Sequence, residues 1–323
     1  MYKFSIIIPV YNAEKTIRKC LESIKVSEYE DYEVIIIDDG SVDRSASIIS
    51  EYTMNDKRFK MISQANSGPS LARNKGLKSS TGEIITFVDS DDYVRSDYLE
   101  MLAKAFEDNK ADVVFFDFHC VRLDGTELSI YHLPDIQENY YKNLVSLSES
   151  YMFGYTWIKA FRKEIAQGIY FDMDLSLFED EIFTCKLLER PVNIFYLREP
   201  IYYYVRMEGT LIQRTHKEYC QLCDRVFSAW KYLLEMDPNG KNNLECRANA
   251  LTEICKFYGL ERKVNPFTFY REMSDSEFLR YATSNDPMTI AIKEQKWFKV
   301  MCLYIKYNIK VVMSKKIFRK VNR

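Results

Sequence analysis

The sequence predicts an α/β fold with a mainly parallel sheet, followed by a helical region. The first third of the chain alternates short apolar segments, typical of strands, with stretches of helical periodicity. This alternation is typical of a parallel sheet that helices cover on both faces. From about residue 210 the apolar residues recur at helical spacing alone. We therefore expect two parts, residues 1–209 and residues 210–323.

The predicted strands of the first part are short, sharply bounded and rich in β-branched or aromatic residues. They comprise residues 4–8, 33–37, 59–62, 83–88 and 112–118. Helices are expected between them, because apolar residues recur at i, i+3, i+4 and i+7. One such face is formed by Ile17, Cys20, Leu21 and Ile24. A second helix is predicted over residues 96–109, with Ser96 as its cap.

Helical spacing dominates the second part of the chain. The predicted helices cover residues 224–236, 242–261, 275–282 and 289–313. Turn signals are expected to separate them at residues 237–240, 265–266 and 285–287.

Composition excludes several classes of protein. The chain has 45 Lys and Arg against 47 Asp and Glu, and this balance argues against wrapping nucleic acid. No segment approaches the roughly 18 apolar residues of a membrane-spanning helix. The apolar run before Pro9 is too short for a signal peptide. We expect a cytoplasmic protein.

Carboxylates follow two of the predicted strands directly. Asp38 and Asp39 end one strand, and Asp89, Asp91 and Asp92 end another. Because parallel strands end at the same edge of a sheet, both groups should line one crevice, where open α/β sheets bind ligands. Like charges at this spacing repel unless a cation or hydrogen-bond donors offset them. The sequence therefore predicts a cation there.

Two loops next to these acids are suited to a nucleotide. In residues 38–45, Gly40 is expected to form a tight turn, with Ser41 or Asp43 capping the next helix. In residues 66–77, a helix should begin after Pro69 and carry Arg73 near its start, an arrangement suited to a diphosphate. Neither a P-loop nor a GxGxxG motif is present.

Together these features predict a nucleoside diphosphate bound through a hard divalent cation. Oxygen ligands select Mg²⁺ or Mn²⁺ over softer metals. A metal held by Asp89 and Asp91 would bridge the two phosphates and neutralise charge as the diphosphate leaves.

Five segments resemble, in order, the motifs of family 2 glycosyltransferases, which are inverting enzymes with the GT-A fold. They are FSIIIPVYNAE from residue 4, EVIIIDDGSVDRS from residue 33, NSGPSLARNKGL from residue 66, GEIITFVDSDD from residue 82 and FEDEIF from residue 178. The resemblance covers roughly residues 4–205. It implies a catalytic domain over 1–209, with a nucleotide-binding half (1–120) and an acceptor-side half (121–209). For residues 210–323 no resemblance is found.

The resemblance also implies roles for individual residues. Asp91 would be the direct metal ligand, and Asp89 would contact the ribose or a metal-bound water. Asp92 is left open and could face the acceptor side. The full nucleotide-sugar site would comprise Pro9, Tyr11, Asp39, Asn66, Arg73, Asp89, Ser90 and Asp91.

A predicted helix over residues 176–188 places Glu179 and Asp180 in its first turn. Acids are common there for electrostatic reasons alone, so a capping role is an equal alternative. The resemblance implies that Asp180 is the general base, with Glu179 as its neighbour. Lys159 follows Ile158, where the family usually has Asn, so its contact with acceptor or phosphate is left open. Arg206 could close over phosphates or be a solvated residue on an edge strand.

Residues 293–323 contain ten basic residues and one acid, Glu294. One helical face would carry Lys296, Lys299, Lys306 and Lys310, opposite Trp297, Met301, Tyr304, Ile305 and Val312. A basic amphipathic helix can lie on an anionic membrane surface. A helix docked on the protein with a solvated lysine face is an equal alternative.

We therefore expect an inverting glycosyltransferase that adds a single sugar from a UDP-sugar to a hydroxyl of a glycan or lipid-linked acceptor. Capsule, cell-wall or exopolysaccharide assembly is the expected context, on the inner face of the cell membrane, and a homo-oligomer is an option. The QxxRW motif of processive synthases is missing. A sugar-nucleotide nucleotidyltransferase is the alternative enzyme, although its GGxGTR start is absent. An inactive binding relative is the non-enzymatic alternative.

Overall fold

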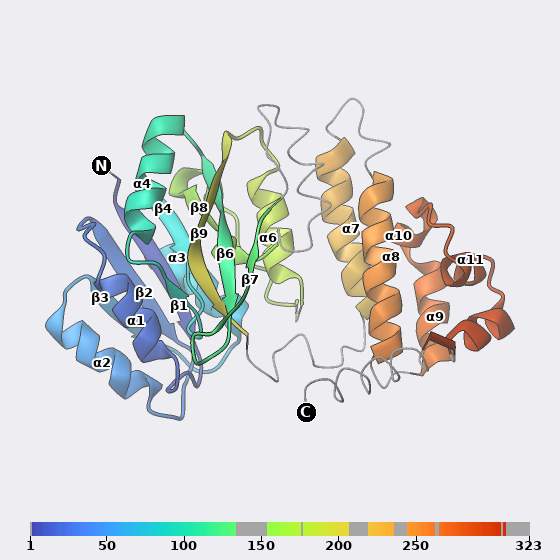
Figure 1. Ribbon diagram of the computed structural model, residues 1–323, viewed down its shortest axis with the longest axis horizontal. Helices are drawn as coiled ribbons and strands as arrows, with labels where there is room; N and C mark the ends of the chain where they lie inside the picture. The colour runs from blue at the N-terminus through green and yellow to red at the C-terminus, as the bar shows by residue number, and fades with distance from the viewer. Residues whose placement is uncertain are drawn as a thin grey trace. The chain divides into compact units, whose positions relative to one another are not determined.

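The computed structural model describes residues 2–133, 154–175, 177–206, 219–235, 244–261, 265–304 and 306–307 (Figure 1). Its contacts divide the chain into two compact units, Met1–Gly209 and Thr210–Arg323. Each unit is described by itself.

A nine-stranded sheet forms the centre of the first unit, within its described residues. The strands are β1 (Phe4–Val10), β2 (Tyr32–Asp38), β3 (Phe59–Ser63), β4 (Ile84–Phe87), β5 (Tyr93–Val94), β6 (Val113–Val121), β7 (Glu127–Tyr131), β8 (Lys159–Arg162) and β9 (Ile194–Val205). Their order is β3-β2-β1-β4-β8-β6-β9-β5, with β7 paired to β6. All five predicted strands of this unit are confirmed.

The sheet is parallel only over β3, β2, β1 and β4. Strand β8 runs antiparallel to both β4 and β6, and β5 and β7 are also antiparallel to their partners. A parallel pairing returns only between β6 and β9. The expectation of a mainly parallel sheet is therefore correct for the first half and wrong for the second. The sequence KAFR of β8, with a cation at each end, has no apolar pattern that predicts a strand.

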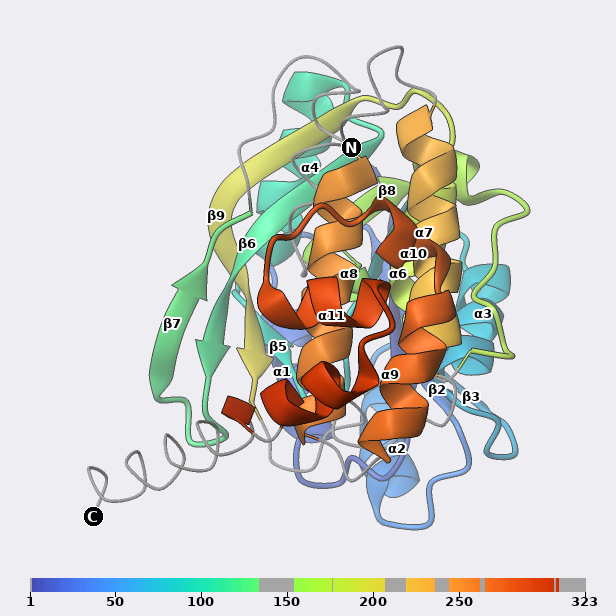
Figure 2. The same cartoon turned by 90° about the vertical axis from the view of Figure 1, so that its right-hand side faces the viewer.

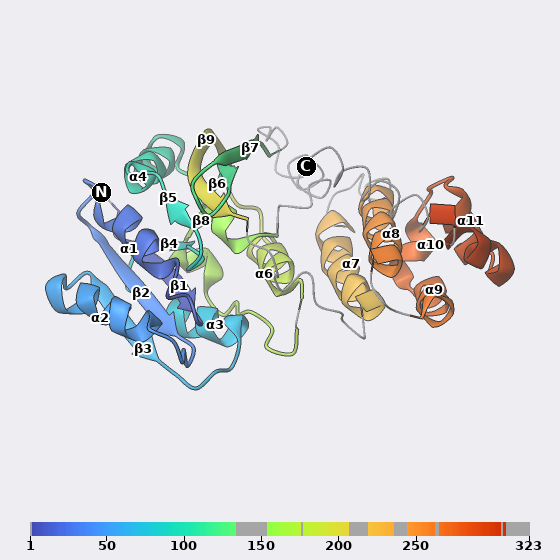
Figure 3. The same ribbon diagram turned by 60° about the horizontal axis from the view of Figure 1, so that its bottom comes forward.

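Helices cover both faces of this sheet (Figure 3). They are α1 (Ile17–Lys25), α2 (Ser45–Asn55), α3 (Pro69–Ser79), α4 (Tyr98–Asn109) and α6 (Glu179–Leu187), with 3₁₀ turns at Thr156–Ile158 and Lys163–Ala166. Tyr52 of α2 donates a hydrogen bond to Glu22 of α1, and Ser27, just after α1, donates one to Glu100 of α4. Helices α3 and α6 are joined by Arg73 and Glu179.

The strand register places the acidic segments on one rim of the sheet. Val10 of β1 lies beside Asp38 of β2, and Ile7 of β1 lies beside Phe87 of β4. The chain continues from these points into Asp39 and into residues 89–92. The prediction that both acidic groups leave the sheet at the same edge is confirmed.

Two predicted helix caps are wrong. Helix α4 has Asp97 rather than Ser96 at its cap position, and the Asp97 carboxylate binds Arg95 instead of the helix amides. Helix α2 has Arg44 at its cap position. Asp43 still accepts a hydrogen bond from the Ser45 N–H at 2.9 Å. Its carboxylate therefore binds the first amide of the helix, although Asp43 lies one residue before the cap position.

The second unit consists of helices in its described residues (Figure 2). They are α7 (Tyr219–Glu235), α8 (Leu244–Glu261), α9 (Pro266–Asp275), α10 (Glu277–Tyr281) and α11 (Pro287–Lys293). Helix α9 was not predicted. The Asn-Pro pair that was expected to mark a turn starts it, because the Asn265 side chain accepts the Phe267 and Thr268 N–H groups.

The basic segment is not one continuous helix. Residues 294–296 interrupt it, with Gln295 in a left-handed conformation at φ 54°, and residues 297–304 are helical again. Val300 is buried, and the Tyr304 ring lies 6.1 Å from that of Tyr270 on α9. This part of the helix therefore packs on its own unit. The turn predicted at 237–240, and Ile305, Lys310 and Val312, lie outside the described residues. No described helix is long and apolar enough to cross a membrane.

A buried carboxylate joins three strands and the loop before β4 at the opposite end of the sheet. Glu33 of β2 is 2% exposed, and Oε1 accepts hydrogen bonds from the Ser5 hydroxyl at 2.7 Å and the Thr81 N–H at 2.6 Å. Oε2 accepts one from Lys60 at 2.8 Å. Burial alone would raise the pKa of Glu33, but these donors outweigh burial and lower the pKa from 4.5 to about 2.

We predict that Glu33→Gln lowers the free energy of unfolding by about 3 kcal/mol at pH 7. Because folding lowers the pKa of Glu33, the contribution is complete above pH 4.5 and is lost as pH falls toward about 2. Urea denaturation at pH 7 and at pH 3 measures both effects. The exposed Glu28→Gln is the control, and equal stabilities of the two variants at pH 7 would contradict the role of Glu33.

Candidate active site

The loop between β4 and β5 gathers the predicted metal ligands. Carboxylate oxygens of Asp89, Asp91 and Asp92 lie within 4.8 Å of one another. The Asp92 N–H donates to the Asp89 carbonyl at 3.0 Å, which closes a tight turn with Ser90 inside it. The predicted grouping of these residues is confirmed.

The electrostatics of this loop fit a cation. Burial, and then the charge of Asp89, raise the pKa of Asp91 to about 6. Burial, and then the charges of Asp91 and Asp89, raise the pKa of Asp92 well above its usual value. A positive ion would reverse both shifts. Several carboxylate oxygens at this spacing are the donor set that a hard divalent ion prefers, so the residues present fit Mg²⁺ or Mn²⁺.

Asp92 supports the loop from inside the protein. It is 2% exposed, and its two oxygens accept hydrogen bonds from the Tyr202 hydroxyl at 2.8 Å and the Val205 N–H at 2.7 Å. The Tyr202 hydroxyl also accepts the Asp89 N–H at 3.1 Å. Asp92 therefore connects the acidic loop to β9. The sequence could not reveal this, because 110 residues separate the partners.

Arg73 connects the acidic loop to helix α6. Arg73 is 8% exposed. Its guanidinium lies between two carboxylates, with Nη1 3.1 Å from Glu179 Oε1 and Nη2 3.5 Å from Asp89 Oδ1. The buried Nε has no hydrogen-bond partner among the described residues. The predicted phosphate ligand is thus already a counterion of the site.

Helix α6 presents the predicted base at its first turn. Phe178 adopts a left-handed conformation at φ 65° and starts the helix, and Asp180 Oδ1 accepts the Glu181 N–H at 2.8 Å. Burial, and then the charge of Glu179, raise the pKa of Asp180 to about 7. A carboxylate with this pKa can accept a proton at neutral pH.

Asp39 organises the second nucleotide loop. Its carboxylate accepts hydrogen bonds from the Gln64 side chain at 2.7 Å, the Ser67 N–H at 2.9 Å and the Gly68 N–H at 2.8 Å. Gly40 follows with φ 74°, and a Cβ there would lie 2.8 Å from the Asn66 nitrogen. The predicted tight turn is confirmed and requires glycine. Direct contact of Asp39 with a base stays a prediction.

The remaining predicted nucleotide residues lie at the ends of β1 and β3. Pro9 is within β1, and Tyr11 follows that strand with 50% of its surface exposed. Asn66 is also exposed. Their contacts with a nucleotide stay predictions.

An aromatic stack that the sequence did not predict borders the acids. Trp157 stacks on Tyr202, Tyr204 and Tyr155, with ring centroids 4.7, 5.3 and 5.2 Å away. The negative charges of Asp92 and Asp180 contribute, after burial, to raising the pKa of Tyr204 and of Tyr155 to about 12. The Tyr202 hydroxyl, which binds Asp92 at 2.8 Å, joins this stack to the acidic loop.

Arg206 is exposed just beyond β9. Because β9 lies between β6 and β5, the expectation of an edge strand there is wrong.

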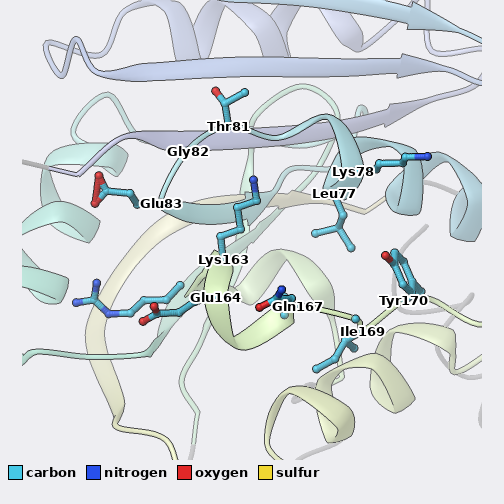
Figure 4. Close-up of a pocket in the computed structure, with 13 residues that line it drawn as sticks. Leu77, Lys78, Thr81, Gly82, Glu83, Lys163, Glu164, Gln167, Ile169 and Tyr170 are labelled. Atoms are coloured by element: carbon cyan, nitrogen blue, oxygen red, sulfur yellow. The ribbon is translucent and has the colours of Figure 1, made fainter.

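A cavity of about 600 Å³ lies away from these acids (Figure 4). It opens at the amino end of β4, whereas the acidic loop follows the carboxyl end of that strand. It is lined by Leu77, Lys78, Thr81, Gly82, Glu83, Arg162, Lys163, Glu164, Ala166, Gln167, Gly168, Ile169 and Tyr170. None of the predicted site residues lines this cavity. The candidate site is therefore identified by its cluster of acidic side chains and not by a cavity.

Solved structures share this fold. The crystal structure of Staphylococcus aureus TarS 1–349 in complex with UDP-GlcNAc has a TM-score of 0.75 at 22% identity, covering 95% of this chain and 92% of that one. The mannosyltransferase PcManGT from Pyrobaculum calidifontis, in complex with GDP-Man and Mn²⁺, has a TM-score of 0.52 at 15% identity, with 95% and 83% covered. The protein therefore has the predicted GT-A fold, with a helical C-terminal region.

The profile of glycosyl transferase family 2 matches residues 5–169, about half of the chain, and the chain belongs to this family. Glycosyltransferase GlyA of Streptococcus pneumoniae is 33% identical over 221 residues, which cover 65% of this chain and 31% of GlyA. The poly(ribitol-phosphate) beta-N-acetylglucosaminyltransferase TarS of Staphylococcus aureus is 30% identical over 215 residues, covering 65% of this chain and 36% of TarS. The chain thus spans about a third of the length of these two relatives.

We predict that Tyr202→Phe destabilises the protein by about 2 kcal/mol, because Asp92 and the Asp89 N–H each lose a buried partner. Mn²⁺ should also bind more weakly to the loosened loop. Chemical denaturation and calorimetric Mn²⁺ titration measure the two effects. Tyr203→Phe, on the opposite face of β9, is the matched control, and identical behaviour of both variants would exclude the bridging role of the Tyr202 hydroxyl.

Proposed function

We propose that this protein is an inverting glycosyltransferase that transfers one sugar from a UDP-sugar to an acceptor hydroxyl. One observation carries the proposal: Arg73 joins the metal-suited loop at Asp89 to the base-bearing helix at Glu179. A donor site and a proton acceptor therefore share one rim of the sheet. Membership of family 2 supports this assignment.

The donor would occupy the rim where β1, β2 and β4 end. Tyr11 and Asn66 offer exposed groups for the nucleoside, and Asp39 holds the loop that contains Asn66. UDP-GlcNAc is the first donor to test, because it is the ligand of the TarS crystal structure of the same fold. A hexose or an N-acetylhexosamine is the proposed class of sugar.

A divalent cation would be held by Asp91 and Asp89. Mg²⁺ or Mn²⁺ bound there would supply positive charge for the diphosphate. Arg73, already between Asp89 and Glu179, would add a second positive charge at the same place. The Mn²⁺ complex of PcManGT supports this choice of metal.

Asp180 is the proposed general base of the reaction. Its carboxylate would take the proton of the acceptor hydroxyl as that oxygen attacks the anomeric carbon of the donor. The bond between that carbon and the phosphate oxygen would break in the same step and release UDP. Glu179 would stay paired with Arg73 and, through its negative charge, keep the pKa of Asp180 raised. Inversion follows from a single displacement at that carbon.

The acceptor is proposed as a glycan or lipid-linked hydroxyl in cell-wall, capsule or exopolysaccharide assembly. The name of TarS, which acts on poly(ribitol-phosphate), supports a cell-wall context. Contact of residues 293–323 with an anionic membrane stays a prediction, as do a homo-oligomer and a cytoplasmic location.

The two alternative functions have less support. A nucleotidyltransferase is disfavoured by membership of family 2. An inactive relative would have no reason to retain both the assembled acidic loop and Asp180 with its raised pKa.

We predict that Asp180→Asn abolishes sugar transfer and leaves UDP affinity unchanged, whereas Asp91→Ala abolishes both transfer and Mn²⁺-dependent UDP binding. The reason is that the first removes the base and the second removes a metal ligand. Turnover of a panel of nucleotide sugars and calorimetric UDP titration, with and without EDTA, measure these effects. Asp124→Asn in the β6–β7 turn is the control. Equal UDP affinity in the two active-site variants would contradict the division of roles.

Activity is also predicted to depend on pH near neutrality. Because Asp180 must be ionised to accept a proton and its pKa is raised to about 7, kcat/KM should fall about tenfold per pH unit below that value. UDP affinity measured over the same range separates binding from catalysis. A rate that stays constant between about pH 5 and pH 8 would rule out Asp180 as the base.

A further inference from the structure

Lys159 is a buried cation beside the proposed base. It is the first residue of β8 and is 1% exposed. The sequence left open whether it contacts an acceptor or a phosphate. A side chain this deeply buried cannot reach a substrate without rearrangement, so its partners must lie inside the protein.

Those partners belong to two different segments. The Nζ atom donates to Thr184 Oγ1 of α6 at 3.0 Å. It also donates to the carbonyls of Gly154, at 3.3 Å, and Tyr155. Among the described residues, three oxygen acceptors surround this nitrogen, and an ammonium group can donate to each of them. Lys159 therefore ties the segment before the 3₁₀ turn to helix α6.

The same contacts reach the first turn of α6. The Thr184 hydroxyl lies 2.8 Å from the Asp180 carbonyl and 3.2 Å from the Gly154 carbonyl. A Cβ at Gly154 would lie 2.7 Å from the Glu181 Cβ, so the two backbones approach closely. The position of Asp180 thus depends on a junction whose centre is the Lys159 ammonium.

Lys159 also favours the ionised form of Asp180. The negative groups facing Asp180 are Glu179 and Asp89, and the positive ones are Arg73 and Lys159. Tyr155 faces it from the segment before β8. Burial lowers the pKa of Lys159 to about 7, and the Asp180 carboxylate opposes that shift. The two charges therefore stabilise each other.

We propose that Lys159 is a positioning residue for the transfer reaction: its buried ammonium fixes the start of α6 against residues 154–155 and keeps Asp180 in place and ionised. The inference rests on the proposed role of Asp180 as the base. It assigns Lys159 no contact with the donor, the metal or the acceptor.

The central test is Lys159→Met, which keeps the volume of the side chain and removes its charge and donors. We expect kcat to fall about 100-fold, because a displaced base loses its alignment, while donor KM and UDP affinity stay unchanged. The acid limb of the kcat/KM profile should move to higher pH, because the carboxylate of Asp180 loses a positive neighbour. Lys186→Met, on the same helix, is the matched control.

Thr184→Val separates position from charge. It removes one acceptor of the ammonium and the bond to the Asp180 carbonyl but keeps the Lys159 charge. We expect a smaller loss of kcat with no shift of the acid limb. This variant also tests the proposal if Lys159→Met does not fold. Wild-type kcat in Thr184→Val would overturn the positioning role.

A stability cycle provides a readout that needs no activity. Lys159→Met should lower the Tm, and adding Asp180→Asn should recover part of the loss, because a buried carboxylate no longer lacks its counterion. Additive Tm changes would overturn the proposed coupling.

These outcomes distinguish the inference from the proposed function. If the wild type turns over a nucleotide sugar and Asp180→Asn does not, the function stands, and an unchanged Lys159→Met would overturn only the inference. If the wild type turns over no donor, the proposed function fails, and the Tm cycle still decides whether Lys159 and Asp180 are coupled.

Discussion

Repulsion among carboxylates at one rim of the sheet is the constraint on which the rest of the site depends. The parallel register of β2, β1 and β4 brings the acidic segments together, and burial deprives them of water that would screen their charges. The fold offsets this in two ways. Tyr202 and a β9 amide hold Asp92, and Arg73 lies between Asp89 and Glu179. Asp91 is not compensated in this way, because burial and the charge of Asp89 still raise its pKa. A bound cation would supply the positive charge that favours its ionised form.

Other buried charges in the first unit are also compensated by partners from several segments. Glu33 at the far end of the sheet is surrounded by donors from three neighbouring segments. Lys159 is surrounded by acceptors from the two segments that flank the proposed base. Each buried charge joins elements that are distant in sequence, because only such elements can supply partners on several sides. The contacts that neutralise these buried charges therefore also hold the functional groups in position.

Arg73 shows how the donor and base sides of the site are linked. A cation that serves two carboxylates at once holds α3, the acidic loop and α6 in fixed relation. A diphosphate arriving at this arginine would compete with both carboxylates for its donors. The chain belongs to glycosyl transferase family 2 and has the GT-A fold, and its strand register brings the acidic segments to one rim of the sheet. Among its described residues, the helical second unit has no group of three acids suited to a metal, although its buried Lys256 also pairs with two carboxylates, those of Glu253 and Asp286.

A structural feature could be predicted from the sequence when the interactions that form it are local along the chain. Strands β1 to β4 and helices α1, α3 and α6 have apolar periods and turn residues that act locally, so the sequence determined them, together with the gathering of Asp89, Asp91 and Asp92. Strand β8 and helix α9 lacked a clear local signal and were missed. The roles of Asp92, Arg73 and Lys159 were decided only by tertiary structure, because their partners lie far along the chain. A local pattern reports which face of an element is apolar, whereas the partner of a buried charge depends on which distant element packs against it.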